Sequence, residues 1–187
     1  MRPWTRDETM MIDDIRIVSK FIDAADTPVP YQEHAFAYWR ELCGGRWAPG
    51  WREFSLADLE NEAIPRTSVT NIQEQPLSSV YRYWGSELTQ VFGRDYTHKS
   101  PADVPPRSLG VSKNGGCGTL VRERKPHLEV KEFISVKKVF GRATVLRMPC
   151  SEDGEAATQG INIYYFESLA GNEPLSSFFD RVFSRLG

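Results

Sequence analysis

Alternation of apolar and polar residues predicts five β-strands, two near the middle of the chain and three in its last third. A period of two is typical of strands with one buried face, and these segments are rich in β-branched and aromatic residues. Turn residues separate them, including Gly141, Asp153 and Gly154. Because short turns join neighbouring strands, we expect one antiparallel sheet. Its predicted strands are residues 67–74, 79–84, 127–137, 142–148 and 160–168.

Apolar positions spaced by three and four predict helices before the sheet. One spans residues 31–43 and is followed by Gly44 and Gly45, which end a helix readily. Another spans residues 11–25, where two aspartates suit the positive end of the helix dipole. A short strand at residues 15–18 is the alternative within that second segment.

Three further helical segments are expected. Ser55 is a suitable N-cap for a brief helix over residues 56–62. Residues 107–124 begin and end like a helix, but interior glycines, each costing roughly 1 kcal/mol, predict that it is broken or bent. Residues 173–186 carry the strongest apolar stripe, which consists of Leu175, Phe178, Phe179, Val182, Phe183 and Leu186.

Residues 81–97 combine both patterns. Tyr81 and Tyr83 alternate with polar neighbours as in a strand, and Gly85 leads into a short apolar run that ends at Gly93. A helix of one or two turns is not stable by itself in water. We therefore expect it to lie on the sheet that the chain has just left.

This segment, YRYWGSELTQVFGRDYT, resembles the part of PAS sensor domains in which the second strand leads into small helices on the ligand side of the sheet. It is most similar to small bacterial PAS proteins with the pattern fRyrlWGTxlxxxfGRDxTG, in which glycine stands at the position of His98. Residues 38–46 resemble the pattern YWRxLrGgr of the same group. Residues 146–155 resemble its pattern lRlPLsxDGe, with Cys150 in place of leucine. The residues that match the first of these patterns are Gly85, Gly93, Arg94, Asp95 and Thr97. Those that match the last pattern include Arg147, Pro149, Asp153 and Gly154.

The resemblance implies an α+β fold with a PAS-like five-stranded antiparallel sheet, short helices on one face, and flanking helices at both ends. It divides the chain into an N-terminal segment with a flanking helix (1–30), a PAS-like domain (31–170) and a C-terminal amphipathic helix (171–187). It also implies a sensory or regulatory role in signal transduction. In that role the domain binds a small ligand or a signalling protein and acts through association, and we expect no output domain in the chain.

Composition narrows the choice of partners. A net charge of −2 and a pI near 6.0 give no basic field, so nucleic acid is not an expected partner. No run of eighteen apolar residues and no signal peptide are present, which predicts a cytoplasmic protein without a membrane contact. The C-terminal apolar stripe must be covered by the free sheet face or by a second copy. We therefore expect a homodimer, with a monomer as the alternative.

Aromatic side chains are the candidates for a ligand pocket, because they make up 12% of the chain. Alternation predicts that Tyr81 and Tyr83 share one strand face and that Tyr164 and Phe166 share another. A ligand there would be mostly apolar or aromatic, with one or two hydrogen bonds. A filled core, as in a ligand-free PAS scaffold, is the alternative. The candidates are Tyr81, Tyr83, Trp84, Phe92, Tyr164 and Phe166.

The sequence contains no catalytic motif, and we predict neither an enzyme nor a named cofactor. The glycine-rich residues 114–118 lack the lysine of a phosphate loop. Cys117 lies outside the motif of flavin-binding PAS photoreceptors. The three cysteines, Cys43, Cys117 and Cys150, are too far apart in sequence for a disulfide framework or a zinc site, and we expect reduced thiols.

The three histidines are the remaining candidates for a metal or haem site or for acid–base catalysis. His34, His98 and His127 lie far apart in the sequence, which disfavours a haem or metal site. The alternative function is a small-molecule enzyme of a cone-shaped α+β type. Such an enzyme would need an acid or base with a shifted pKa inside the cavity, such as His127, Glu129 or Asp95.

Overall fold

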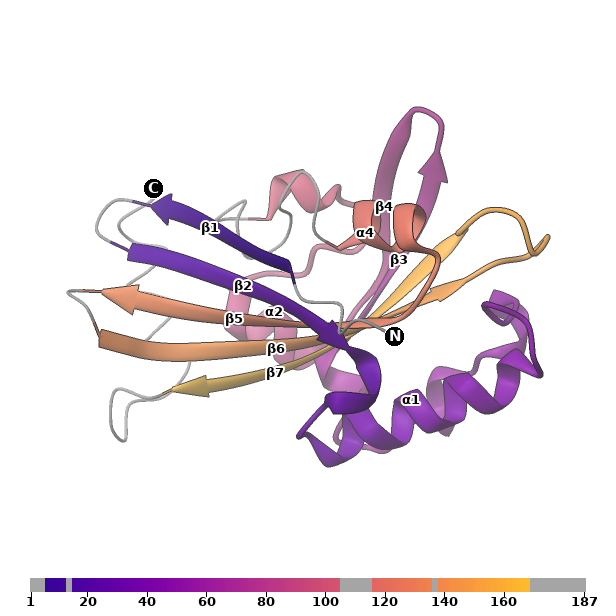
Figure 1. Cartoon of the computed structure of the whole chain (residues 1–187), viewed down its shortest axis with the longest axis horizontal. Coiled ribbons are helices and arrows are strands. Elements are labelled where there is room, and N and C mark those ends of the chain that lie inside the picture. Colours follow the sequence, from indigo (N-terminus) through magenta and orange to yellow (C-terminus); the bar gives the residue numbers. More distant parts are fainter. Residues whose placement is uncertain (1–5, 13–14, 105–115, 136–137, 169–187) are drawn as a thin grey trace.

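A seven-stranded antiparallel sheet is the centre of the computed structural model, which describes residues 6–12, 15–104, 116–135 and 138–168. The strands lie side by side in the order β1-β2-β5-β6-β7-β3-β4, and all neighbours are antiparallel. β3 and β4 are turned far from the direction of β1 and β2, as the twist of a large sheet requires (Figure 1). The strands are β1 Arg6–Ile12, β2 Ile15–Asp23, β3 Thr67–Glu74, β4 Leu77–Trp84, β5 His127–Ser135, β6 Lys138–Cys150 and β7 Gln159–Ser168.

The α+β class and the single antiparallel sheet are confirmed, and the five predicted strands correspond to β3–β7. The predicted number of strands is wrong, because β1 and β2 add a hairpin at the free edge of β5. The helix predicted over residues 11–25 is therefore also wrong. Within β2, the buried residues Ile17, Ser19 and Phe21 alternate with more exposed neighbours. The burial of this segment thus follows the period of two of a strand and not the period of three to four of a helix.

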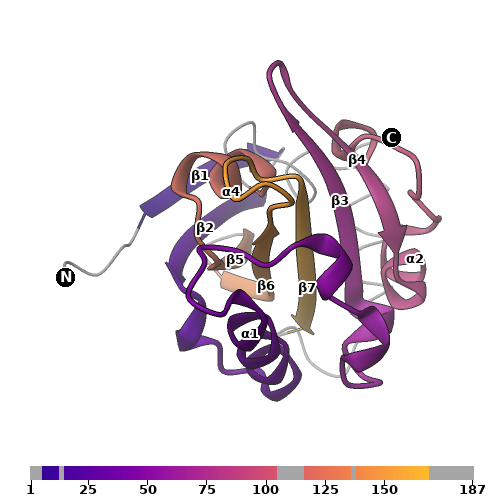
Figure 2. The ribbon, with the colours of Figure 1, turned by 90° about the vertical axis from the view of Figure 1, so that its right-hand side faces the viewer.

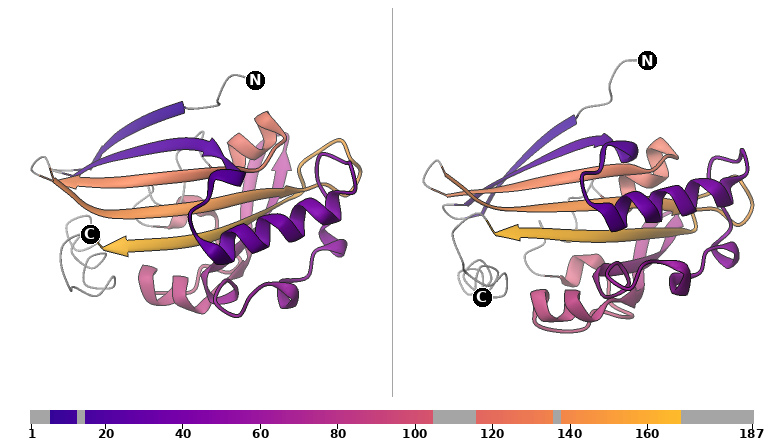
Figure 3. Two further views of the ribbon diagram at one scale, coloured as in Figure 1. Left: turned by 60° about the horizontal axis from the view of Figure 1, so that its bottom comes forward. Right: turned by 90° about the horizontal axis from the view of Figure 1, so that it is seen from below.

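The helix predicted over residues 31–43 is confirmed as α1, Pro30–Cys43, and it covers one face of the sheet (Figure 3). It buries Tyr31, Ala35 and Trp39, and it ends at Gly44 in the left-handed conformation. The buried side chain of Gln32 donates to two strand carbonyls, those of Thr144 at 3.1 Å and Ile163 at 2.8 Å, which fixes the helix on the sheet. The brief helix predicted after Ser55 is a single 3-10 turn, Leu56–Asp58, and the Ser55 side chain makes no cap hydrogen bond there.

Helix α2, Ser86–Phe92, and helix α4, Cys117–Glu123, cover the opposite face, which we call the α2 face (Figure 2). The passage from β4 into α2 requires glycine, because a Cβ atom at Gly85 would lie 2.2 Å from the carbonyl oxygen of Pro65. α4 is the described part of the predicted bent helix. The remainder of that segment and the C-terminal helix predicted at residues 173–186 lie outside the described residues. The homodimer was predicted from the apolar stripe of that C-terminal helix, so it stays a prediction.

Both faces of the central sheet are thus covered. In β6, residues 143–150 are all buried, and alternate side chains enter two different cores. Ala143 and Val145 belong to the core under α2, whereas Leu146, Met148 and Cys150 belong to the core under α1. This arrangement places Arg147, which shares the face of Val145, inside the protein rather than in solvent.

Candidate functional site

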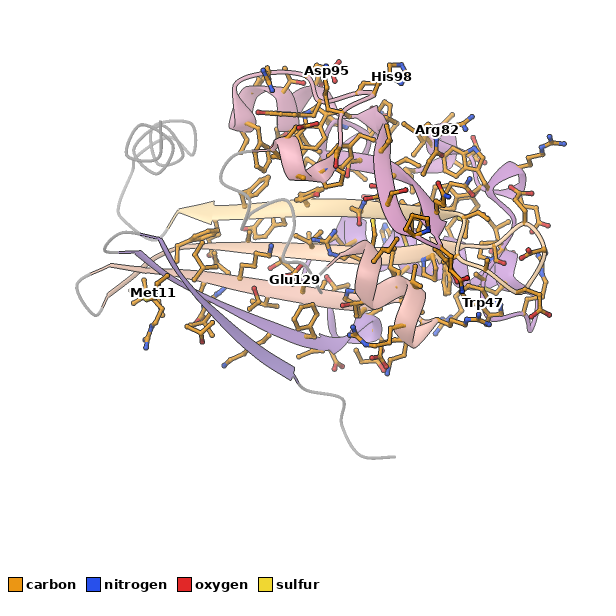
Figure 4. The ribbon with its side chains drawn as sticks, turned by 90° about the horizontal axis from the view of Figure 1, so that it is seen from above. Met11, Trp47, Arg82, Asp95, His98 and Glu129 are labelled. Atoms are coloured by element: carbon orange, nitrogen blue, oxygen red, sulfur yellow. The ribbon has the colours of Figure 1, made fainter. Side chains whose placement is uncertain are left out.

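Ionisable side chains lie buried on the α2 face, where a filled core would carry apolar ones. We call Glu129, Lys131, Arg147 and Asn162 the buried polar cluster; each is at most 3% exposed. Glu129 lies over the middle of the sheet (Figure 4). Strand alternation gathers these side chains, because positions 129 and 131 of β5 share the face of position 147 of β6 and position 162 of β7.

Arg147 is the centre of the cluster. Its Nε and Nη2 donate to Oε2 of Glu129 at 3.1 and 2.8 Å, and its Nη1 donates to Oδ1 of Asn162 at 2.8 Å. Nζ of Lys131 lies 3.3 Å from Oε1 of Glu129. The amide nitrogen of Asn162 extends the network to Oγ of Ser68 at 3.3 Å. The cluster thus joins side chains from β5, β6, β7 and β3.

Electrostatics keep Glu129 ionised. Burial by itself would raise the pKa of this carboxyl group, but the positive charges of Lys131 and Arg147 outweigh it and hold the pKa at about 2. Burial and the charge of Arg147 lower the pKa of His127, the neighbour in β5, to about 3. At neutral pH the imidazole is therefore neutral, and of the three charges in the cluster two are positive.

The start of α4 closes over Arg147. Gly116 has φ of 60°, and a Cβ atom there would lie 3.4 Å from Cζ of Arg147, so bare backbone faces the guanidinium. The side chain of Cys117 interacts with Ser79 and Thr70. Burial raises the pKa of Cys117, so it is a neutral thiol rather than a nucleophilic thiolate.

Five of the six aromatic candidates meet beside this cluster, in the core under α2. The ring centroids of Tyr81 and Trp84 are 4.7 Å apart, and those of Trp84 and Phe92 are 5.3 Å apart, both edge to face. Phe166 lies 6.1 Å from Phe92 and 5.8 Å from Tyr164. The indole Nε1 of Trp84 is buried and has no hydrogen-bond partner among the described residues.

Tyr83 is not part of this group, and the prediction that it shares a face with Tyr81 is wrong. A β-bulge lies where Val69 pairs with Tyr83 and Thr70 pairs with Tyr81, so Arg82 is an extra residue in β4. The bulge reverses the alternation and places Trp84 rather than Tyr83 on the face of Tyr81. The Tyr83 hydroxyl instead donates to the carbonyl of Ile64 at 3.2 Å.

Most motif residues form turns rather than a site. Oδ1 of Asp95 accepts hydrogen bonds from the backbone N–H and the hydroxyl of Thr97, both at 2.7 Å, and Asp95 is exposed. Gly93 ends α2 with φ of 79°, and the guanidinium of Arg94 lies 4.7 Å from the Tyr96 ring centroid.

The second motif also forms a turn and a strand end. Oδ1 of Asp153 accepts from the N–H groups of Glu155 and Ala156 at 2.8 and 3.0 Å, and Gly154 has φ of 77°. The carbonyl of Pro149 accepts from Nε1 of Trp39 at 2.7 Å. Among the motif residues, Arg147 is the member that enters the buried polar cluster. Lys131 and Asn162 were not predicted.

His98 adopts φ of 66°, a conformation that glycine tolerates better than other residues do. We expect His98→Gly to raise the free energy of unfolding by about 0.5 to 1 kcal/mol, since relief of backbone strain exceeds the entropy cost of glycine. Urea denaturation measures this change in the free energy of unfolding. Lys99→Gly is the control and should be destabilising, because Lys99 does not have positive φ. A loss of stability in His98→Gly would contradict the prediction.

The other candidate groups do not assemble. His34 lies on α1 beside Glu60, His98 lies in the turn after α2, and His127 lies in β5. Within the described part of the chain, no group of three His, Cys, Asp or Glu side chains could hold a metal ion. Cys43 and Cys150 are buried free thiols on the α1 face. No helix among the described residues is both long and apolar enough to cross a membrane.

Comparison of the chain with known protein families, with curated proteins and with solved structures found no match. Any assignment of function therefore depends on the buried polar cluster and its surroundings.

Proposed function

We propose that this chain is a PAS-like sensory module that binds a small ligand on the α2 face, at the buried polar cluster. The observation that carries the proposal is the burial of Lys131, Glu129 and Arg147 in the core, each at most 3% exposed. Burying an ion costs several kcal/mol, and well-packed apolar side chains of similar size would be as stable or more stable. Stability alone therefore does not account for the cluster.

The strand order supports the PAS-like part of the proposal. β3 to β7 lie in the order β4-β3-β7-β6-β5, so the first and last of these five strands are neighbours, as in a PAS sheet. The helices between β4 and β5 lie on the face that carries the cluster. The β1–β2 hairpin and α1 are additions at the β5 edge and on the other face. Binding of a ligand would then alter how the module associates with a second copy or with a signalling protein.

Acid–base catalysis fits the site less well than binding does. A general base works best with a pKa near the operating pH. The pKa of Glu129 is about 2 and that of His127 is about 3, so both are weak bases at neutral pH. Asp95, the third candidate, is exposed in a turn. The shifts thus favour fixed charges that hold a ligand over groups that exchange protons.

Native mass spectrometry of the protein purified from its own host tests the proposal. We expect a small molecule to be retained by the wild-type chain and lost from Arg147→Met. Arg142→Met is the matched control, because Arg142 lies on the same strand but is partly exposed and pairs with Glu132 and Glu167. Retention of the molecule by Arg147→Met, or the absence of any bound molecule in the wild type, would contradict the proposal.

A further inference from the structure

Part of β4 has a free outer edge, because β4 is the last strand on one side of the described sheet. At Tyr81 the outward backbone groups are used: the N–H donates to the carbonyl of Lys99 at 2.9 Å, and the carbonyl accepts from the N–H of His98 at 2.8 Å. Alternate residues of a strand point the same way, and β4 pairs with β3 without a shift from Tyr81 to Leu77. The backbone groups of Ser79 and Leu77 therefore also point outward, where no described residue pairs with them.

Apolar side chains are exposed at the same place. Among the described residues, the large apolar side chains with an exposed surface are Met11, Leu77 and Val80, and the last two lie on this free edge. Figure 1 and Figure 2 show that the β3–β4 hairpin, which carries them, stands out from the body of the protein. Edge strands are usually protected by charged side chains, proline or a bulge. Residues 77–80, with the sequence LSSV, have none of these, which indicates an interaction surface.

The length of the free edge limits what can pair with it. At Tyr81 the edge is already covered by the turn at residues 98–99. A long extended peptide that paired with Ser79 would therefore run into this turn. A partner strand has to turn away after a few residues, as the end of a hairpin does. The β3–β4 hairpin of a second copy meets this condition, since its chain turns back at residues 75–76, next to Leu77.

We propose that two copies of the chain associate through the free outer edges of β4, which pair antiparallel around a two-fold axis at Ser78. Leu77 of each copy then exchanges backbone hydrogen bonds with Ser79 of the other, so the outward groups of both residues are satisfied. Leu77 of the second copy also lies beside Ser79, whose side chain lines a hollow of about 240 Å³. Residues 77–80 carry no charge, so the two copies do not repel each other there. This contact needs no ligand, so it goes beyond the proposed function and does not rest on it.

The small size of the contact decides how it can be detected. A few backbone hydrogen bonds bury less surface than a stable interface, which covers roughly 1,200 Å² or more. We therefore expect association that depends on protein concentration and that a covalent bond can trap. At the axis, Ser78 faces Ser78 of the second copy in a pair without hydrogen bonds, which brings the two Cα atoms to about 4.5 Å. A disulfide needs a Cα separation of roughly 4.4–6.8 Å, so cysteines at this position can form one.

Oxidative cross-linking of Ser78→Cys tests the contact. With copper phenanthroline and dissolved oxygen as the oxidant, we expect a disulfide-linked dimer on a non-reducing gel. Asn71→Cys is the matched control, because Asn71 is also exposed but lies on β3, opposite Val80 and one strand further from the edge. It should give at least tenfold less dimer than Ser78→Cys. The wild type measures the background from the three native cysteines.

Two further substitutions in the Ser78→Cys chain separate strand pairing from random collision. Ser79→Pro removes an outward N–H and no hydrogen bond to β3, and Leu77→Lys brings two positive charges together near the axis. Each should lower the yield of dimer at least fivefold. If Ser79→Pro lowers the melting temperature, Leu77→Lys decides. Equal yields from Ser78→Cys and Asn71→Cys, or a yield that Leu77→Lys leaves unchanged, would overturn the inference, and neither result bears on the retained small molecule of the proposed function.

Discussion

Replacing Glu129 with glutamine is expected to lower the free energy of unfolding by about 3 to 5 kcal/mol. The substitution keeps the size and shape of the side chain, so the loss is electrostatic rather than a packing defect. It leaves Lys131 and Arg147 buried without the carboxylate that both contact, at 3.3 and 2.8 Å. Removal of the charge that two buried cations share is among the most costly defects that one substitution can create. Urea denaturation at pH 7 measures the loss.

Glu132→Gln is the matched control for this prediction. Glu132 lies on the same strand, but its side chain is 28% exposed and it pairs with Arg142, which is 39% exposed. A pair in such a position contributes no more than about 1 kcal/mol. Arg147→Met should cost less than Glu129→Gln, because Glu129 then keeps Lys131 as its partner. A loss below about 1 kcal/mol in Glu129→Gln would mean that the cluster is not electrostatically coupled as described.

The strands of the sheet were predictable because their burial depends on local alternation. The β1–β2 hairpin was not, since Ile15, Val18 and Ile22 fit a helical spacing as well as part of a strand. What decides between them is the free edge of β5, more than a hundred residues away, which pairs with β2 along its full length. A local sequence pattern predicts which residues are buried, but it does not predict which distant strand has an unpaired edge.

The site was predictable in part. The resemblance drew attention to Arg147, and Glu129 was considered as a candidate acid. Lys131 and Asn162 were missed because alternating polar residues in a strand ordinarily face solvent, and no local signal shows that this face of the sheet is buried. Tyr83 was misplaced because a one-residue bulge has no clear sequence signature here. The C-terminal helix and the homodimer remain predictions.

Acidification is expected to destabilise the protein through His127 before any carboxylate of the cluster titrates. The ordinary pKa of histidine is 6.5, and burial and the charge of Arg147 lower the pKa of His127 to about 3 in the folded state. Below pH 6.5 the unfolded chain therefore binds a proton that the folded chain does not. Stability falls as the pH falls through this window, by about 3 kcal/mol at pH 4.5 and about 4 kcal/mol at pH 3.

The carboxyl group of Glu129 affects stability at lower pH than His127 does, so the two contributions can be measured separately. The pKa of its carboxyl group is lowered from 4.5 to about 2, so its contribution is fully present above pH 4.5 and is lost as the pH falls towards 2. Urea denaturation between pH 7 and pH 4.5 thus isolates the histidine. His127→Gln should make stability nearly independent of pH in that range, because glutamine does not titrate. His34→Gln, which removes an exposed histidine, is the control. The same slope in His127→Gln and in the wild type would show that His127 is not held neutral by the core, and would remove the argument that this imidazole contributes no charge to the buried polar cluster.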